Sequence, residues 1–131
     1  MNYYLSKSNA IIVFIFTTFV FTSCKPKAEI QFLSKEIQIG NIKAGETKQI
    51  VTEIKNIGSD TLIIDNISAG CNCTKVNLDL KKIPPGEKTN VNFTYHASII
   101  LKPKDPINVA IVVRSNTENK FDELYLKGTI K

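Results

Sequence analysis

The sequence predicts an all-β protein: an immunoglobulin-like β-sandwich of about seven to eight antiparallel strands, preceded by a cleaved lipoprotein signal peptide. Two observations on the chain after residue 28 lead to this fold class. No segment there keeps the hydrophobic period of an amphipathic helix. Short strand-like runs recur at close spacing between turns rich in Gly, Pro, Asn and Asp, as they do in sandwiches and barrels. An open barrel is the alternative architecture.

The first four predicted strands cover residues 29–33, 36–42, 48–55 and 61–68. A turn that contains Gly45 separates the second strand from the third. The third strand places Ile50 and Ile54 on one face. Residues 56–60 form the next turn, because Asn and Gly tolerate the positive φ values that turns demand. The fourth strand is rich in Ile and Leu.

The last four predicted strands cover residues 75–80, 89–95, 107–113 and 122–130. Pro84 and Pro85 predict a turn before the second of these strands, because proline cannot donate to a sheet. The run 89–95 alternates, with Val91, Phe93 and Tyr95 facing inward. The run 107–113 is apolar on both faces, which predicts a central strand covered on both sides. Gly128 interrupts the apolar face of the final strand.

The N-terminus carries the pattern of an export signal. A start with one basic residue, Lys7, precedes the uncharged run 11–21, which is shorter than the roughly 20 residues that span a bilayer. The following Phe-Thr-Ser-Cys resembles the lipobox of bacterial lipoproteins. That resemblance implies cleavage after Ser23 and acyl chains on Cys24. The alternative is an ordinary signal peptide or a signal anchor in which Cys24 is incidental.

The chain therefore divides into a signal peptide (1–23), a lipidated N-terminus and tether (24–28), and one domain (29–131). Loss of the signal leaves 108 of the 131 residues, with 16 of the 17 basic residues against 12 acidic ones. The basic residues form no stripe with interleaved aromatics, so we expect no nucleic-acid partner. We also expect no enzyme and no cofactor, because familiar catalytic motifs are missing and a catalytic triad would have to use the single histidine, His96.

Several short motifs together resemble the bacterial domain of unknown function 1573 family. They are Ile39-Gly40, Ala44-Gly45-Glu46, Asn56-Ile57-Gly58, Gly70-Cys71-Asn72-Cys73-Thr74, Pro85-Gly86-Glu87, Val91-Asn92-Phe93-Thr94-Tyr95, Arg114-Ser115-Asn116 and Leu124-Tyr125-Leu126-Lys127-Gly128. The resemblance covers nearly all of the mature chain. It implies an exported lipoprotein of the kind abundant in Bacteroidetes, with an immunoglobulin-like fold related to Hydin-type domains, and it implies no settled activity.

The chain departs from the family pattern at two places that matter below. Asn72 replaces the glycine of the usual Cys-Gly-Cys-Thr element, and we expect Asn72 to permit the turn because Asn tolerates a left-handed backbone. The segment 97–106 lacks the usual glycine, so its loop is expected to differ.

Cys71 and Cys73 form the single constellation with potential chemistry. On an extended strand their Cα atoms would lie about 6.6 Å apart, near the upper limit for a disulfide, unless a turn at Asn72 brings them closer. Three interpretations remain open: a local structural pair, a thiol-redox or partner-linking pair, and a metal site. We expect that these residues do not hold a metal, because zinc needs four ligands and the chain offers two thiols and His96. A thioether copper site is excluded, since Met1 is the only methionine.

The leading hypothesis is a membrane-anchored cell-envelope lipoprotein that acts as a non-enzymatic binding or structural module for a protein or envelope component. The alternative is a thiol-redox or metal-handling lipoprotein that uses Cys71 and Cys73. The domain would lie in the periplasm or at the cell surface. The outer membrane is slightly favoured, because Lys25 follows Cys24 in place of the aspartate that retains enterobacterial lipoproteins at the inner membrane.

Overall fold

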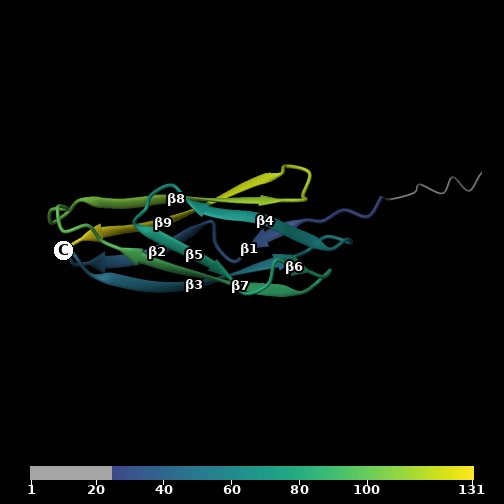
Figure 1. The fold of residues 1–131 in the computed structure, drawn as a ribbon, viewed down its shortest axis with the longest axis horizontal. Coiled ribbons are helices and arrows are strands. Elements are labelled where there is room, and N and C mark those ends of the chain that lie inside the picture. The colour runs from purple at the N-terminus through teal and green to yellow at the C-terminus, as the bar shows by residue number, and fades with distance from the viewer. Residues whose placement is uncertain (1–24) are drawn as a thin grey trace, which may run out of the picture.

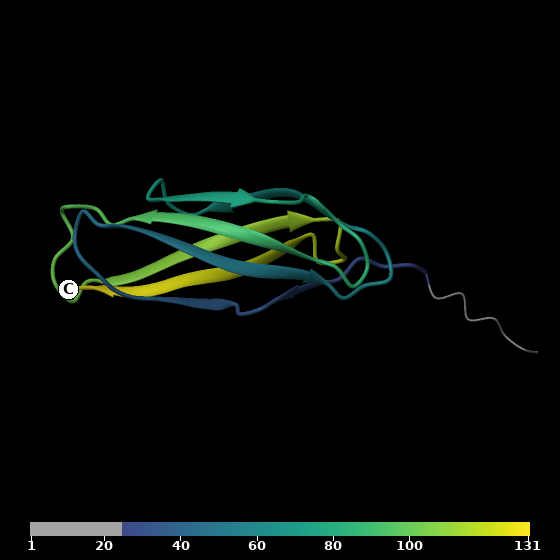
Figure 2. The same ribbon diagram turned by 90° about the horizontal axis from the view of Figure 1, so that it is seen from below.

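The computed structural model describes residues 25–131, which form two β-sheets packed face to face (Figures 1 and 2). The predicted signal peptide and Cys24 lie outside the described residues. The nine strands are β1 (Ile30–Phe32), β2 (Glu36–Ile42), β3 (Thr47–Asn56), β4 (Leu62–Ala69), β5 (Thr74–Leu78), β6 (Lys82–Ile83), β7 (Lys88–His96), β8 (Pro106–Ser115) and β9 (Phe121–Ile130). The first sheet has the order β1-β3-β7-β5 and the second β2-β9-β8-β4-β6. The predicted sandwich is confirmed.

The strands differ from prediction in number and in direction. The additional strand is β6, which consists of the two residues directly before the prolines of the predicted turn. It pairs with β4. One pair, β2 with β9, is parallel, although we predicted antiparallel strands throughout. These two strands come from opposite ends of the chain, so no tight hairpin forces them to run in opposite directions.

Two predicted details of individual strands are also wrong. The strand predicted for residues 75–80 ends at Leu78, and Leu80 is exposed, because the chain turns there towards β6. The strand β8 is central, as predicted, but only its inner face is fully covered. Its outer face bears half-buried Ala110 and Val112 between exposed Asn108 and Arg114.

The core lies between the sheets and consists of alternate residues of the long strands. The predicted inward residues of β7 are buried, as are Leu124, Leu126 and Ile130 on the apolar face of β9. Ile54 of β3 is also buried, whereas Ile50 is half-buried against the core. The largest fully buried side chains are those of Phe93, Ile39, Ile42, Ile54, Leu62, Ile64, Ile83, Ile111, Leu124, Leu126, Ile130 and Val91. Burial of a side chain of this size stabilises the fold by roughly 1.5–3 kcal/mol. The core thus supplies the main driving force for folding.

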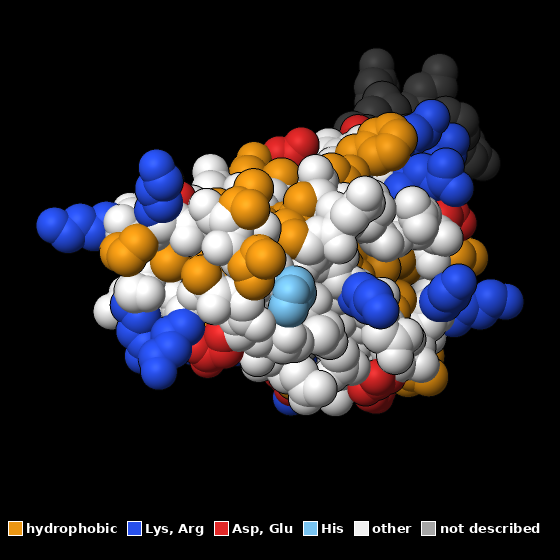
Figure 3. Space-filling view, turned by 60° about the vertical axis from the view of Figure 1, so that its left-hand side comes forward, with side chains coloured by type: hydrophobic (Ala, Val, Ile, Leu, Met, Phe, Trp, Pro, Cys, Tyr) orange, Lys and Arg blue, Asp and Glu red, His pale blue; other side chains and the backbone are white. Residues whose placement is uncertain are grey.

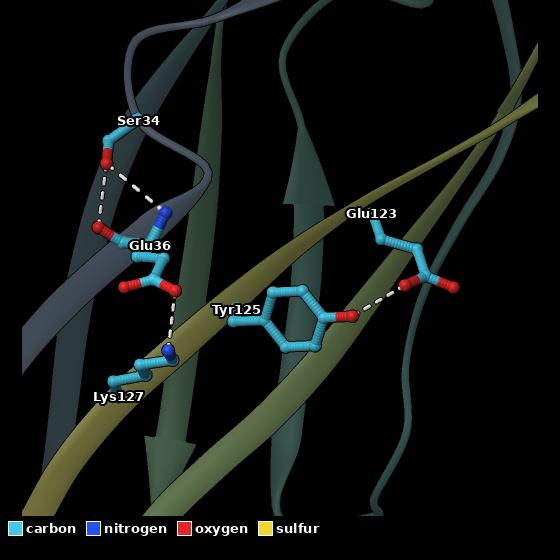
Figure 4. A network of polar contacts seen from close by, with 5 residues as sticks. All are labelled: Ser34, Glu36, Glu123, Tyr125 and Lys127. Carbon is cyan, nitrogen blue, oxygen red and sulfur yellow. Dashed lines mark hydrogen bonds and ion pairs between the residues drawn. The ribbon is translucent and has the colours of Figure 1, made fainter.

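The chain changes sheets between β1 and β2, and polar contacts fix this crossing against β9 (Figure 4). The Ser34 hydroxyl donates to the Glu36 carbonyl at 2.7 Å, and the Glu36 carboxylate pairs with Lys127 Nζ at 2.5 Å. On the same strand, the Tyr125 hydroxyl donates to Glu123 at 2.6 Å. This hydrogen bond to Glu123, together with the negative charge of Glu123, raises the pKa of Tyr125.

The parallel pair requires two glycines where β2 and β9 approach each other. Its register shifts between Gln38 and Gly40, and Gly40 has a φ of 70°. A Cβ on Gly128 would lie 2.6 Å from the Gly40 carbonyl oxygen and 2.6 Å from Ile39 Cγ1. Gly128 therefore interrupts the apolar face of β9 because no side chain fits beside β2.

Asn56, at the end of β3, is fully buried and joins three segments. Its side-chain amide donates to the Asp60 carbonyl at 2.7 Å and to the Ile83 carbonyl at 2.9 Å, and its Oδ1 accepts from Gly58 N at 2.9 Å. Its backbone also exchanges hydrogen bonds with the turn that contains Gly86. The side chain thus replaces water for backbone groups that would otherwise be buried without partners.

We expect Asn56→Ala to lower the free energy of unfolding by about 3 kcal/mol, since three backbone groups lose their partner at about 1 kcal/mol or more each. Urea unfolding measures this change. The matched control is Asn90→Ala, an exposed position on β7, which should shift stability by less than about 0.5 kcal/mol. Equal effects of the two substitutions would contradict the role given to Asn56.

Candidate functional site

The two ends of the sandwich differ in what they carry. The first described residue, Lys25, lies at one end, and the C-terminus lies at the other (Figures 1 and 2). The first end, which we call the tether end, consists of residues 25–29, 57–61, 84–87 and 116–120. The opposite end, which we call the distal end, consists of residues 43–46, 97–105 and 131.

The tether end is tied together by many contacts. The Lys27 carbonyl accepts hydrogen bonds from Ser59 N at 2.8 Å and Asp60 N at 3.3 Å. A Cβ on Gly58 would lie 2.2 Å from the same carbonyl oxygen, so Gly58 is needed for this approach. Ala28, predicted to be part of the tether, is buried in the core. Packing of the domain therefore begins just before the predicted boundary at residue 29.

An exposed ion pair adds to these contacts. Lys27 Nζ hydrogen-bonds the Glu118 carboxylate in the turn between β8 and β9. This contact lowers the pKa of Glu118 and raises the pKa of Lys27. The pair joins the N-terminal segment to a second loop of the tether end.

The distal end is a compact loop cluster that exposes two isoleucines. The turn at Gly45 is joined to Ala97 by two backbone hydrogen bonds of 2.9 Å: Gly45 N donates to the Ala97 carbonyl, and Ala97 N donates to the Glu46 carbonyl. Next to it, Ile99 and Ile100 are 79% and 81% exposed, and Ile99 lies over Gly45. In Figure 3, which turns the distal end towards the viewer, apolar side chains gather beside the histidine with lysine or arginine side chains around them.

The backbone of the 97–105 loop contains one strained residue. Lys104 has a φ of 74°, in the region where glycine is normally found, and its N–H donates to the Ile130 carbonyl at 2.7 Å. Asp105 accepts from Lys102 N at 2.7 Å. In this loop, which lacks the family's usual glycine, Lys104 thus adopts the left-handed conformation, and hydrogen bonds on either side hold it in place.

Cys71 and Cys73 lie in the connection from β4 to β5, where the chain passes from one sheet to the other. The two cysteines form a disulfide, with their Cα atoms 5.2 Å apart. The turn at Asn72 therefore brings them closer than an extended strand would. The expectation of a left-handed backbone at Asn72 is wrong, because Asn72 is not among the described residues that have a positive φ.

Backbone hydrogen bonds hold both sides of this turn. Gly70 N donates to the Ala110 carbonyl at 2.8 Å, and His96 N donates to the Cys73 carbonyl at 2.8 Å. The buried hydroxyl of Thr74 lies 3.6 Å from Cys71 Sγ and 3.8 Å from Cys73 Sγ. Thr74 was not predicted as a site residue, although its position next to Cys73 in the sequence was the available signal.

The structure places His96 beside Cys73 through the backbone, but its ring is used elsewhere. Its Nδ1 is hydrogen-bonded to Thr47 Oγ1 at 2.8 Å on the exposed face. Across residues 25–131, no three His, Cys, Asp or Glu side chains gather closely enough to hold a metal ion. The same range has no helix long and apolar enough to cross a membrane. Sequence spacing could not reveal the contact with Thr47, which is 49 residues away.

Removing the disulfide should cost little stability. We expect the double variant Cys71→Ser, Cys73→Ser to lose about 1.6 kcal/mol, which is the entropy of closing a loop of about three residues. Urea unfolding of the variant and of the oxidised wild type measures the difference, and added reductant should leave the variant unchanged. A loss above about 3 kcal/mol would mean that the sulfurs hold the turn in place.

Solved structures confirm the fold class. A protein of unknown function from Porphyromonas gingivalis W83 aligns with a TM-score of 0.68 and 16% identity, over 86% of this chain and 51% of that one. The chain thus spans about half the length of that protein. The ASH/PapD-like domain of human CEP192 aligns with a TM-score of 0.59 and 11% identity, over 80% of this chain and 87% of the other.

The Pseudomonas aeruginosa CupB2 chaperone aligns with a TM-score of 0.54 and 9% identity, over 77% of this chain and 55% of the chaperone. No curated protein matches the sequence. Residues 30–130 match the family described as "Protein of unknown function (DUF1573)". This chain therefore belongs to the DUF1573 family.

Proposed function

We propose that this protein is a lipid-anchored cell-envelope lipoprotein whose sandwich is a non-enzymatic binding module, and that its distal end binds another envelope protein. One observation carries this proposal: Ile99 and Ile100 are exposed at the end of the domain that lies opposite the N-terminal segment. An anchor on Cys24 would join the membrane to the tether end. The exposed isoleucines would then point away from that membrane.

The isoleucine pair has the character of a small binding patch. Two large adjacent apolar side chains in water lose the stabilisation that burial would give, roughly 1.5–3 kcal/mol each. Large apolar side chains exposed together mark interaction sites more often than isolated ones do. The loop that carries them is held by the hydrogen bonds of Ala97 and Lys104, so little ordering is needed on binding.

The arrangement of polar groups supports a binding role over catalysis. The single histidine is engaged by Thr47 through Nδ1, and the hollow beside β1 is lined by Glu53 and Lys88, which pair with each other at 2.7 Å. Within the described residues these surfaces do not combine a nucleophile, a base and an acid. A partner protein that covers the isoleucines therefore explains more of the surface than a substrate does.

The anchor is tested by Cys24→Ser. We expect this variant to leave the membrane fraction, whereas the wild type and the Cys71→Ser, Cys73→Ser variant stay in it. Intact mass should show that the wild type begins at residue 24 and carries acyl chains, because two or more chains are needed for stable anchoring. A Cys24→Ser protein that has lost residues 1–23 by mass and still remains in the membrane fraction would contradict lipidation as the anchor.

The distal patch is tested by photo-cross-linking of the anchored protein in its own membranes. A cross-linker at Ile100 should trap a defined partner protein, and Ile99→Asp should lower the yield about tenfold or more, since it removes a buried apolar contact. The matched control is Leu33→Asp, at a similarly exposed residue that follows β1, which should leave the yield unchanged. Cross-links to lipid alone, or equal loss with both substitutions, would overturn the proposal.

A further inference from the structure

We infer that the Cys71–Cys73 disulfide is a redox centre that undergoes thiol–disulfide exchange with a protein dithiol. This activity is independent of the partner proposed for the distal end. The inference combines three properties of the β4–β5 turn: a disulfide that spans a single turn, two half-buried cysteines on either side of an exposed residue, and a hydroxyl near both sulfurs.

The bond does not act as a staple between distant parts of the fold. It joins residues two apart in the sequence, within a single turn. The turn is already fixed to β8 by Gly70 and to β7 by Cys73, through backbone hydrogen bonds of 2.8 Å each. The pairing of β5 with β7 starts at the next residue, Thr74. Opening the bond therefore leaves every one of these backbone contacts in place.

The two cysteines are only partly covered. Cys71 and Cys73 pack against the core but are half-buried, and Asn72 between them is exposed, where the chain passes from one sheet to the other. Thiol–disulfide exchange needs an incoming thiolate to approach one sulfur directly. A fully buried disulfide would not permit that approach, whereas Cys71 and Cys73 are half-buried beside exposed Asn72.

Thr74 gives the turn a hydrogen-bond donor for the thiolate that exchange creates. Its hydroxyl lies 3.6 Å from Cys71 Sγ and 3.8 Å from Cys73 Sγ, and the side chain is otherwise buried. Residues 70–76 contain one charged residue, Lys75, and no acid. A hydrogen-bond donor near sulfur favours the thiolate over the thiol.

The exchange step is balanced between the two proteins. A thiolate of the partner dithiol attacks one cysteine sulfur, the Cys71–Cys73 bond breaks, and a mixed disulfide forms. The released sulfur leaves as a thiolate, accepts a hydrogen bond from Thr74, and takes a proton. The partner's second thiol, after losing its proton, attacks the mixed disulfide. The partner is thereby oxidised to a disulfide, and Cys71 and Cys73 are reduced to two thiols.

The test uses the full mature lipoprotein in detergent, with reduced thioredoxin as the protein dithiol probe. We expect one thioredoxin to be oxidised for each Cys71–Cys73 pair that gains two alkylatable thiols by mass. The β-sheet circular dichroism signal should stay unchanged, and oxidised dithiothreitol should restore the bond. The inference is overturned if thioredoxin stays reduced while the domain remains folded, or if opening the bond abolishes the β-sheet signal.

A second variant separates a redox role from a structural one. Thr74→Val keeps the shape of the side chain but removes the hydroxyl, so alkylation of the reduced protein at neutral pH should slow about tenfold, the effect of one pKa unit. The matched control is Thr52→Val, another buried threonine on a core-facing strand position, which should leave the rate unchanged. An unchanged rate in Thr74→Val would remove Thr74 from the mechanism and leave exchange without its donor, which contradicts the inference.

Discussion

The fold depends on one buried amide, the side chain of Asn56. Its three hydrogen bonds satisfy backbone groups of the turn after β3 and of β6, and its own backbone is bonded to the 84–87 turn. The strand β6 pairs with β4 in the second sheet, whereas Asn56 belongs to the first. A single side chain therefore closes the tether end across both layers. Apolar packing drives the sheets together, but it does not fix the positions of the turns at this end. The hydrogen-bond geometry of the Asn56 amide fixes them.

The two ends divide stability and surface chemistry between them. At the tether end, the N-terminal segment packs closely against Gly58 and accepts hydrogen bonds from the 57–61 turn, and Lys27 forms an ion pair with Glu118. At the distal end, the backbone is equally well bonded, yet Ile99 and Ile100 stay in water. The disulfide turn lies on the connection between sheets, where its two cysteines pack against the edge of the core and stay half-buried. Each site thus occupies a position where its chemistry does not disturb the packing of the sandwich.

Hydrophobic alternation was sufficient to predict the long strands, because their inner faces contact the core directly. It failed for β6, whose two residues are too few to show a period, and for the direction of β2, which depends on a partner some 90 residues away. The outer face of β8 looked buried because Ala110 and Val112 are apolar, yet nothing in the described chain covers them fully. At the candidate site, the sequence predicted the cysteine pair and a turn at Asn72, but not the backbone conformation of that turn. The hydroxyl of Thr74 and the exposure of Ile99 emerge only when β5, β7 and the 97–105 loop are brought together.

The change of sheets between β1 and β2 has a mechanical consequence. The first segment of the chain is bonded to β3 in one sheet and then to β9 in the other, both along the long axis of the domain. A pull between the N-terminal segment and a partner held at the opposite end would load these ladders along their length. Backbone hydrogen bonds lie across the strands, so such a force shears the six paired positions of β2 with β9 together and does not unzip them singly. The order in which the chain enters its two layers therefore favours resistance to extension along the long axis of the domain.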